Sequence, residues 1–325
     1  MIKIAIDAMG SDAGSAMVVE AVKKFQATYK DVELYVVGKA SELEEISSVA
    51  TIIDAKDVMG MEDGALEVLR RKESSMLKAL DLVVNKTCAG ICTAGSTAAF
   101  LTGATIKLKM IPGIVRGAYM SPFPTEDGKG VVVLDLGANN ENTPEHLVQF
   151  AKMGNVFAEK IWQRPNPKVY LLSNGSEENK GSPVGKEAYQ ILKKEEKLNF
   201  CGNLEARDVL SGKADVIVCD GYAGNILLKT LEGSLSLVKR LLKEAFMKSK
   251  KTKMGYLLTR SALAGFAEKL DYKQYGGGLL VGVNGVAVKA HGNSDALTFY
   301  HAIRLTYELI KGQVVEQIGE AMKNG

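Results

Sequence analysis

The sequence predicts an α/β protein whose sheet is largely parallel and covered by helices on both faces. Short apolar strands, loops rich in Gly, Asn, Ser or Asp, and amphipathic helices alternate along most of the 325 residues. In addition, 46% of the residues are hydrophobic, and no Pro-, Ser- or Gly-rich linker divides the chain. We therefore expect a single three-layer α/β/α domain over residues 1–325.

The strand–loop–helix unit recurs from one end of the chain to the other. Thr143 and Ser182 are predicted N-caps, because each hydroxyl can accept a hydrogen bond from the first turn of a helix and a proline follows each. The expected units are 2–7 with a helix from about Ala16, Ile91 and Cys92 with a helix ending near Lys109, 131–136 with a helix from Pro144, 168–172 with a helix from Pro183, 216–218 with a helix from Ile226, and GVAVKA with a helix from about Ala296.

Residues 234–275 break this alternation, because two helical stretches follow each other there without an intervening strand. The segment KSKKTK, residues 248–253, joins the two stretches. We expect this part of the chain to form a helical excursion from the sheet.

Composition and missing motifs exclude several classes of protein. The net charge is +3 with 24% charged residues, which does not indicate a nucleic-acid partner. The cysteines lack the spacing of a disulfide framework or of a complete metal site, which predicts reduced thiols and no bound metal. No signal peptide and no membrane-spanning apolar run is recognisable, which predicts a cytoplasmic protein. Walker, dinucleotide, nucleophile-elbow and zinc-protease motifs are absent, so no cofactor is expected.

Several loops after the strands carry amides, hydroxyls and one lysine. TAGST places Ser96 and Thr97 ahead of a helix, and ENKGS places Lys180 ahead of another. The stretch DGYAGN, residues 220–225, either supplies turn residues or holds an anion at a helix start, where backbone N–H groups and the macrodipole favour negative charge. His291, which precedes GNSD, has either a loop-capping role or a site role.

Ligands of α/β proteins bind at the carboxyl ends of parallel strands, where these loops lie. The parts they offer suit a phosphate better than covalent catalysis. We therefore expect the loops at Ser96, Lys180, Asn225 and Asn293 to approach one another around a phosphate.

Several stretches give the chain an end-to-end resemblance to a known family. They are DAMG (7–10), LDLGAN (134–139), PEHLVQFAKMG (144–154), NFCGNLEARD (199–208), DGYAGNILLKTLEG (220–233) and YGGGLLVGVNGVAVKAHGNSD (275–295). Together they resemble the phosphate acyltransferase (PlsX) family of bacterial phospholipid synthesis. The resemblance implies an isocitrate/isopropylmalate-dehydrogenase-like fold and a homodimer. It also implies transfer of a long-chain fatty acyl group from acyl carrier protein to inorganic phosphate, giving acyl phosphate.

By the same resemblance, Lys180 and Asn225 correspond to catalytic residues. Lys180 can offset phosphate charge or polarise the thioester carbonyl, and Asn225 can donate a hydrogen bond from its amide. Phosphate is itself the nucleophile, so the reaction needs no Ser–His or Cys–His pair. Ser11, Ala13 and Ser96 depart from the family's usual loops. The residues assigned to phosphate or acyl binding are Asp7, Gly10, Ser96, Thr97, Asn139, Asp220, Gly224, His291, Asn293 and Ser294.

The second helical stretch of the excursion carries an apolar face beside a cluster of lysines. Apolar residues recur at near-helical spacing between Met254 and Leu270. Such a surface suits an anionic membrane or the acidic carrier protein, and the alternative is a face packed in the core or across a dimer interface. The residues expected to make the contact are Leu257, Leu258, Leu263, Phe266, Lys250, Lys251, Lys253 and Arg260.

Two other functions remain open at this point. A phosphotransacetylase-like enzyme would use a short acyl-CoA with the same phosphate chemistry, and it would need no extended apolar groove. A non-catalytic phosphate-binding scaffold at the membrane would result if the loop departures disable the site. The family function and the scaffold both imply a cytoplasmic protein with peripheral membrane association.

Overall fold

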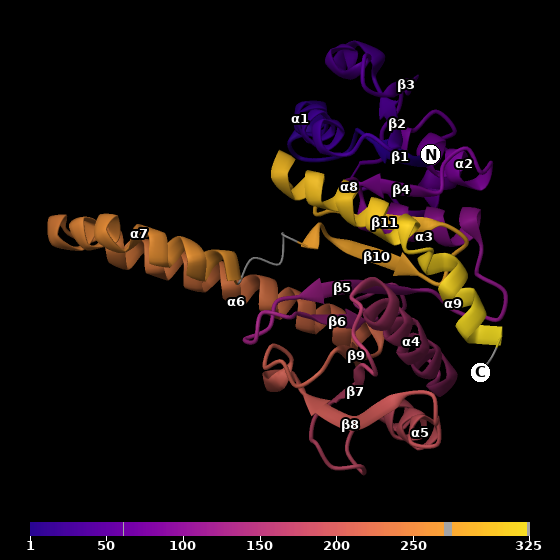
Figure 1. Ribbon diagram of the computed structural model, residues 1–325, viewed down its shortest axis with the longest axis vertical. Coiled ribbons are helices and arrows are strands. Elements are labelled where there is room, and N and C mark those ends of the chain that lie inside the picture. The colour runs from indigo at the N-terminus through magenta and orange to yellow at the C-terminus, as the bar shows by residue number, and fades with distance from the viewer. Residues whose placement is uncertain (61, 270–274, 324–325) are drawn as a thin grey trace.

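The computed structural model describes residues 1–60, 62–269 and 275–323, with the side chains of residues 266–269 left out. The described strands form one 11-stranded sheet in the order β3-β2-β1-β4-β11-β10-β5-β6-β9-β7-β8 (Figure 1). The strands are β1 (Ile2–Asp7), β2 (Val32–Gly38), β3 (Thr51–Asp54), β4 (Gly90–Thr93), β5 (Ala118–Phe123), β6 (Val131–Leu134), β7 (Lys168–Ser173), β8 (Asn199–Glu205), β9 (Val216–Val218), β10 (Gly278–Val281) and β11 (Val286–Lys289).

The sheet consists of two parallel blocks that run in opposite directions. β1, β2, β3, β4 and β11 are parallel to one another, and so are β6, β7, β8 and β9. β10 and β5 lie between the blocks, where the pairings of β11 with β10, β10 with β5 and β5 with β6 are antiparallel. The prediction of a largely parallel sheet is confirmed. The carboxyl ends of β4 and β11, however, lie at the opposite end of the sheet from those of β6 and β9.

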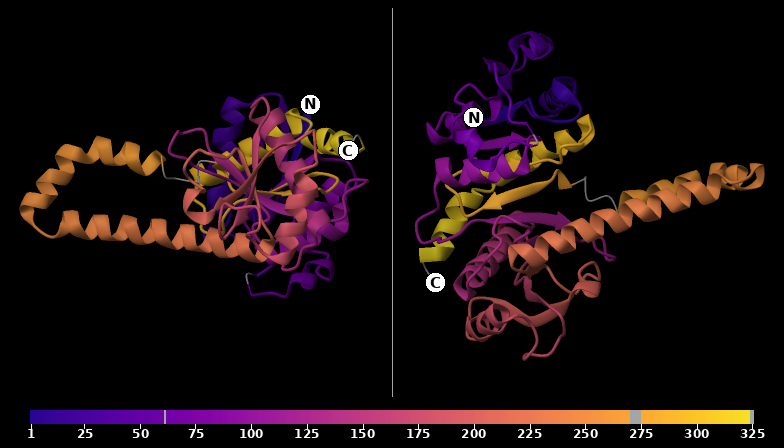
Figure 2. Two further views of the ribbon diagram at one scale, coloured as in Figure 1. Left: turned by 90° about the horizontal axis from the view of Figure 1, so that it is seen from below. Right: turned by 180° about the vertical axis from the view of Figure 1, so that it is seen from behind.

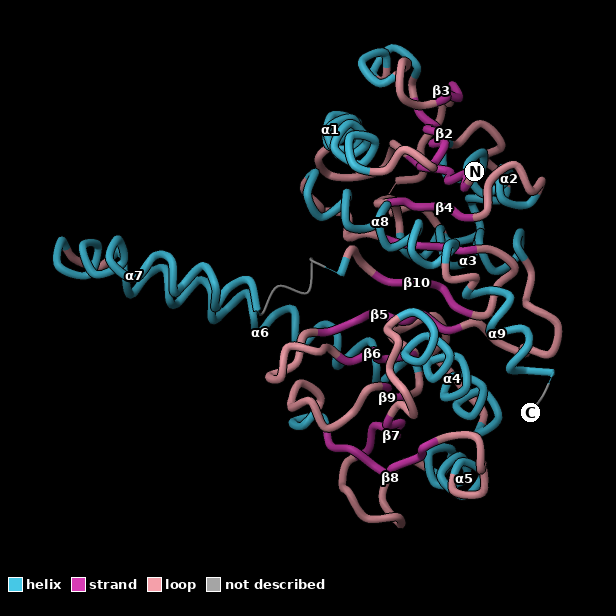
Figure 3. Tube along the Cα trace, in the orientation of Figure 1, coloured by secondary structure: helices cyan, strands magenta, loops and turns pink. Residues whose placement is uncertain are grey.

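Helices cover both faces of the sheet, as predicted (Figures 2 and 3). One face packs against α1, α4, α5, α8 and α9, and the other against α2, α3 and α6. Successive side chains of a strand point to opposite faces of the sheet. In β1, Ile4 and Ile6 pack on the face covered by α1 and α8, and Ala5 packs on the face covered by α2 and α3. The helices are α1 (Gly14–Thr28), α2 (Ser75–Val84), α3 (Thr97–Leu108), α4 (Pro144–Val156), α5 (Pro183–Leu192), α6 (Gly221–Met247), α7 (Lys250–Lys269), α8 (Ala296–Lys311) and α9 (Val314–Lys323), with short turns η1 (Ala40–Glu42), η2 (Glu44–Ile46), η3 (Ala65–Leu69), η4 (Phe157–Ile161) and η5 (Ala206–Asp208).

The two predicted N-caps are confirmed. Thr143 Oγ1 accepts a hydrogen bond from His146 N at 3.4 Å, and Ser182 Oγ accepts one from Gly185 N at 3.1 Å. The predicted start of the helix at Ile226 is wrong, because α6 begins at Gly221. Asp220 Oδ1 accepts a hydrogen bond from Ala223 N at 2.7 Å and so caps the helix five residues earlier than expected.

α6 and α7 form a long hairpin that extends away from the sheet (Figures 1 and 2). Leu227 and Leu228 still pack against the core, whereas Leu237, Leu241 and further apolar residues of α6 are exposed. Among the described helices, none combines the length and hydrophobicity needed to cross a lipid bilayer.

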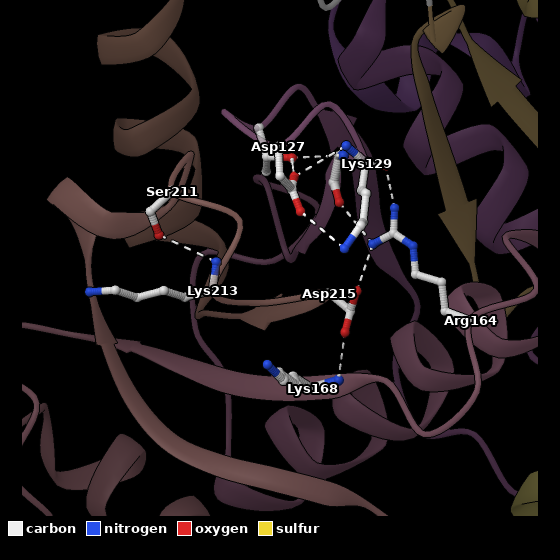
Figure 4. Close-up of polar contacts among 9 residues, drawn as sticks. Asp127, Lys129, Arg164, Lys168, Ser211, Lys213 and Asp215 are labelled. Carbon is white, nitrogen blue, oxygen red and sulfur yellow. Dashed lines mark hydrogen bonds and ion pairs between the residues drawn. The ribbon is translucent and has the colours of Figure 1, made fainter.

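Hydrogen bonds of Arg164 and Asp215 connect the amino-terminal ends of β6, β9 and β7 (Figure 4). Arg164 Nη1 donates to Gly130 O and to Asp215 Oδ1, each at 2.8 Å. Asp215 Oδ2 accepts a hydrogen bond from Lys168 N at 2.9 Å. The guanidinium also lies 4.2 Å from the centre of the Trp162 ring, a favourable cation–π distance. Since both partners of the ion pair are largely buried, removing either one would leave the other buried group without its counter-charge and destabilise the second parallel block.

Asp215→Ala is expected to lower the free energy of unfolding by about 2 kcal/mol, because Arg164 loses its only carboxylate partner among the described residues and the Lys168 N–H loses its acceptor. Urea unfolding measures this change. Asp208→Ala is the matched control, since its ion pair with Lys213 is largely exposed and should contribute no more than about 0.5 kcal/mol. Equal losses in the two variants would contradict the structural role of Asp215.

Candidate functional site

A cavity of about 610 Å³ lies at the end of the sheet where β4 and β11 finish. Its walls come from the loop after β1, the first residue of α3, the middle of α6 and the end of β11 with the loop that follows. We call it the α6–β11 cavity. Its lining residues are Asp12, Thr97, Lys229, Glu232, Gly233, Ser236, Lys289, His291, Gly292 and Asn293.

A row of polar side chains ends the three strands beside this cavity. Asp7, Thr93 and Lys289 are the last residues of β1, β4 and β11, and they lie in register. Thr93 Oγ1 donates to Asp7 Oδ2 at 2.7 Å and accepts a hydrogen bond from Gly95 N at 2.9 Å. Met9 N donates to Asp7 Oδ1 at 3.2 Å. Asp7 was predicted to bind substrate. In the structure, hydrogen bonds from Thr93 and Met9 hold its carboxylate in place beside the cavity.

Burial shifts the pKa values of Asp7 and Lys289, the two ionisable residues at the ends of this row. Asp7 is 2% exposed and Lys289 is 3% exposed. Burial raises the pKa of the Asp7 carboxyl. It lowers the pKa of the Lys289 ammonium to about 8. Lys289 Nζ donates a hydrogen bond to the Ala290 carbonyl. The row thus places a buried, titratable lysine at the cavity.

The loops after β1 and β4 touch through their glycines. Gly10 has φ +81°, and a Cβ there would lie 3.2 Å from Gly95 Cα, so a side chain at Gly10 would push the loops apart. Ser96 is buried and does not line the cavity, whereas Thr97 is exposed and does. Among the described residues no side chain caps α3, which leaves its first-turn N–H groups available to a ligand.

The loop after β11 forms the far wall. His291 Nδ1 lies 3.8 Å from Glu232 Oε1, and Lys229 Nζ donates to Glu232 Oε2 at 2.9 Å. Asn293 lines the cavity, as predicted for a site residue. Ser294 is buried, and its hydroxyl has no hydrogen-bond partner among the described residues. Ser294 lies outside the cavity lining, so its predicted binding role has no support from this cavity.

A second polar loop follows β6, at the other end of the sheet. The Asp135 carboxylate accepts hydrogen bonds from the backbone N–H groups of Tyr119, Gly137, Ala138 and Asn139 at 2.9–3.1 Å. Asn139 Nδ2 donates to Asp135 Oδ2 and to Gly117 O, each at 2.8 Å. Both N–H groups of the Asn139 side-chain amide therefore form hydrogen bonds within the protein and stabilise this loop. Asn139 was predicted to bind substrate, and this structural role was not predicted.

The start of α6 packs closely against this loop. Asp220, predicted to bind substrate, caps the helix. A Cβ at Gly224 would lie 1.9 Å from Asp135 O, so this glycine permits a close approach of two backbones. Asn225 is exposed, and its Cβ would lie 3.2 Å from a Cβ added at Gly137. One helical turn later on the same face, Lys229 lines the α6–β11 cavity.

Lys180 lies in the exposed loop between β7 and α5, at the end of the sheet shared with β6 and β9. Ser96 and Asn293 follow β4 and β11 and lie at the opposite end. The prediction that the loops at Ser96, Lys180, Asn225 and Asn293 meet within one chain is therefore wrong. The physical reason is the reversal of strand direction through β10 and β5, which separates loops that occupy equivalent places in the sequence pattern.

The residues predicted to contact a membrane or the carrier protein lie on α7. Leu258 is 80% exposed and Leu257 is 63% exposed. Lys250, Lys251, Lys253 and Arg260 are exposed and Leu263 is half-buried, while the side chain of Phe266 and residue Leu270 lie outside the described part. Packing of this face in the α/β core, the alternative considered above, does not apply to Leu257 and Leu258.

We did not identify several polar residues of the α6–β11 cavity and of the loop after β6 from the sequence. Lys289 looked like an ordinary member of the apolar run GVAVKA, although a lysine in a strand buried on both faces is itself a signal. Lys229 and Glu232 lay within a helical pattern that gave no reason to single them out. Asp135, in VVVLDLGAN, sits at the end of a buried strand and was passed over for Asn139.

Residues 2–317 match the family model described as fatty acid synthesis protein. A phosphate acyltransferase of Staphylococcus haemolyticus (strain JCSC1435) is 41% identical over 305 residues, which cover 94% of this chain and 93% of that protein. A phosphotransacetylase from Streptococcus pyogenes is similar in structure, with a TM-score of 0.61, 18% identity, and coverage of 97% of this chain and 94% of that one.

An isocitrate dehydrogenase from Methylococcus capsulatus also shares the fold, with a TM-score of 0.51, 13% identity, and coverage of 99% of this chain and 98% of that one. The fold implied by the sequence resemblance is confirmed. Since the family model and a relative at 41% identity both extend over nearly the whole sequence, the chain belongs to the fatty acid synthesis protein family.

Proposed function

We propose that this protein transfers a long-chain fatty acyl group from acyl carrier protein to inorganic phosphate and forms acyl phosphate. The observation that carries the proposal is the 41% identity, over 94% of the chain, to a protein named phosphate acyltransferase. The polar cavity beside the α3 N-terminus is compatible with an anionic substrate. We also propose that residues 1–325 act as one domain, because a single sheet runs through the described residues.

The reaction needs positioning and charge stabilisation more than a protein nucleophile. A phosphate oxygen attacks the thioester carbonyl carbon, the new carbon–oxygen bond forms, the carbon–sulfur bond breaks, and the leaving thiolate takes up a proton released by phosphate. Burial raises the pKa of Cys88 and of Cys92 to about 12, so neither is a ready thiolate nucleophile. This agrees with direct attack by phosphate.

We propose that Lys180 and Asn225 act on the thioester end of the reaction. Both side chains are exposed and available to a substrate. The Lys180 cation can stabilise negative charge on the carbonyl oxygen, and the Asn225 amide can donate a hydrogen bond near the loop at Gly137. Because Lys180 and the α6–β11 cavity lie at opposite ends of the sheet, we propose that a second copy of the chain brings them together in a homodimer.

The proposed activity is tested by the discharge of palmitoyl-acyl carrier protein in the presence and absence of phosphate. We expect discharge that requires phosphate and produces free carrier-protein thiol. An enzyme that prefers acetyl-CoA would instead be phosphotransacetylase-like, a function favoured only by the shared fold with the Streptococcus pyogenes enzyme. A protein that discharges neither substrate would contradict the proposal and favour a phosphate-binding scaffold.

We propose that the α6–α7 hairpin makes peripheral contact with anionic membrane and with acyl carrier protein. Exposed apolar side chains on α7 lie near exposed lysines at the hairpin turn, a combination that favours an anionic lipid surface. The exposed apolar residues Leu237, Val238, Leu241 and Leu242 of α6 offer a face to a second copy. Sedimentation that reports a monomer would contradict the dimer.

Leu258→Glu is expected to weaken binding to anionic liposomes at least tenfold, because it places a carboxylate at the most exposed leucine of α7. Flotation with phosphatidylglycerol vesicles measures the loss, and discharge of a soluble acyl donor should persist. Ser261→Glu is the matched control, since it adds the same charge at an exposed polar position of the same helix. Liposome binding of Leu258→Glu equal to that of the wild type would remove the membrane assignment.

A further inference from the structure

Lys289 is a buried lysine that forms no ion pair with another described residue. Its side chain is 3% exposed, and its ammonium donates to the Ala290 carbonyl while forming no ion pair within the described part of the chain. Lysine is almost never buried this deeply unless it is paired, because removing an ammonium from water is costly. An anion bound in the adjoining cavity would offset this cost and stabilise the charged form of Lys289.

Among the described residues, no carboxylate forms an ion pair with Lys289. The Asp7 carboxylate attracts the ammonium from a longer distance, and Glu232 Oε1 lies buried at the cavity without a hydrogen-bond partner in the described part of the chain. Thr93 and Met9 donate to the Asp7 carboxylate, and Thr93 lies between Asp7 and Lys289 in the row. Glu232 pairs with Lys229 at 2.9 Å. Asp12 is exposed at the cavity rim.

The cavity beside Lys289 offers donors to an anion. Thr97 carries a hydroxyl into the lining and begins α3, whose first-turn N–H groups have no side-chain cap among the described residues. Asn293 contributes an amide from the opposite wall. A buried cation, a hydroxyl, an amide and uncapped helix N–H groups together match the charge and acceptor oxygens of a phosphate.

We propose that Lys289 binds the nucleophilic phosphate in the α6–β11 cavity and that the Asp7–Thr93 pair positions the strand ends around it. This inference rests on the proposed acyl transfer to phosphate and assigns the place of one substrate. The Lys289 ammonium neutralises part of the phosphate charge and holds one oxygen for attack. Asp7 acts through Thr93 and Gly95 and is a positioning residue.

The charge of Lys289 should make phosphate binding depend on pH. Burial lowers the pKa of Lys289 to about 8, so the ammonium is present below that pH and is lost as the pH rises through it. Binding should therefore weaken above pH about 8, where phosphate is mostly the dianion and its own charge changes little. The groups facing Lys289 are Asp7 on β1, Asp12 after β1, Cys92 on β4, Lys229 and Glu232 on α6, and His291 after β11.

Lys289→Met tests the proposal, since methionine keeps a similar length and removes the charge. We expect the KM for phosphate to rise about 100-fold with a smaller change in the KM for the acyl donor. We also expect 10 mM inorganic phosphate, used as the probe, to raise the Tm of the wild type and to leave that of Lys289→Met unchanged. The control is Lys3→Met, a lysine at the opposite end of the same strand block, whose phosphate response should equal that of the wild type.

The outcomes separate this inference from the proposed function. A wild type stabilised by phosphate only through Lys289, but unable to discharge an acyl thioester, would refute the acyl transfer and retain the phosphate site. A folded Lys289→Met variant with wild-type phosphate response and KM would overturn the inference whatever the wild type catalyses. If Lys289→Met fails to fold, the wild-type pH profile decides, because phosphate stabilisation that persists unchanged from pH 8 to pH 9.5 would also overturn it.

Discussion

Gly224→Ala should destabilise the protein and abolish acyl transfer. A Cβ there would lie 1.9 Å from the Asp135 carbonyl oxygen and 2.8 Å from Cys219 Sγ, so α6 would have to move away from the loop after β6. Forced overpacking of this kind costs about 1–3 kcal/mol and occasionally more. The same movement would displace Asn225 and Lys229, which follow on the helix. Urea unfolding and the palmitoyl-acyl carrier protein assay measure the two effects.

Gly233→Ala is the matched stability control on the same helix. A Cβ at Gly233 meets no atom within 4 Å, and alanine favours the helix by about 0.5–1 kcal/mol over glycine. We therefore expect this variant to unfold at equal or higher urea concentration than the wild type. A Gly224→Ala variant that unfolds at the wild-type midpoint would show that α6 does not approach the loop this closely.

Lys180→Ala and Asn225→Ala should each lower turnover by about 100- to 1,000-fold while leaving the fold intact. Both side chains are exposed, so their removal should change the free energy of unfolding by no more than about 0.5 kcal/mol. Initial rates with palmitoyl-acyl carrier protein, together with urea midpoints, measure the two quantities. Lys186→Ala on α5 and Thr230→Ala on α6 are exposed controls that should keep wild-type turnover.

The two catalytic variants also test the proposed homodimer. If Lys180 of one copy serves the site that contains Asn225 of the other, mixed dimers of the two variants contain one intact site and recover activity. If both residues act within one chain, mixing recovers nothing. Wild-type turnover in either single variant would remove that residue from the catalytic assignment.

The alternation of strands and helices could be predicted from the sequence because it depends on local patterns. The caps at Thr143 and Ser182 follow from side chains that bond to the next turn, and the structure contains both. The direction of each strand could not be predicted in the same way, because it depends on which strands pair with each other across the sheet. The antiparallel pairing of β10 with β5 joins strands far apart in the sequence and leaves no mark on the apolar pattern. The pairings of β10 with β11 and of β5 with β6 are local hairpins that the strand–helix pattern did not identify.

This difference explains why the candidate site was only partly predictable. Thr97, His291 and Asn293 were selected as polar residues beyond strand ends, and they line one cavity. Lys180 was selected by the same reasoning, yet it lies beyond a strand of the opposite block. Lys289 was not selected, because its burial and the row it forms with Thr93 are visible only in the folded sheet.

The stretch DGYAGN shows how one pattern can serve two purposes. Asp220 caps α6, and Gly224 allows the helix to approach the loop after β6. These roles belong to turn and packing chemistry. The same arrangement leaves Asn225 exposed beside Gly137, one turn before Lys229 at the cavity. Turn and packing chemistry therefore explains Asp220 and Gly224, and it leaves Asn225 accessible for the proposed catalytic role.

The most direct test of the proposed function is the identity of the product formed from palmitoyl-acyl carrier protein and ¹⁸O-labelled phosphate. Mass spectrometry should detect palmitoyl phosphate that retains all the labelled phosphate oxygens, because a phosphate oxygen attacks the carbonyl carbon and stays in the new bond. After the unreacted palmitoyl-acyl carrier protein is removed, since hydroxylamine also cleaves thioesters, hydroxylamine should yield palmitoyl hydroxamate only from reactions that contained phosphate. Release of unlabelled palmitate without phosphate would identify a thioesterase and contradict acyl transfer to phosphate.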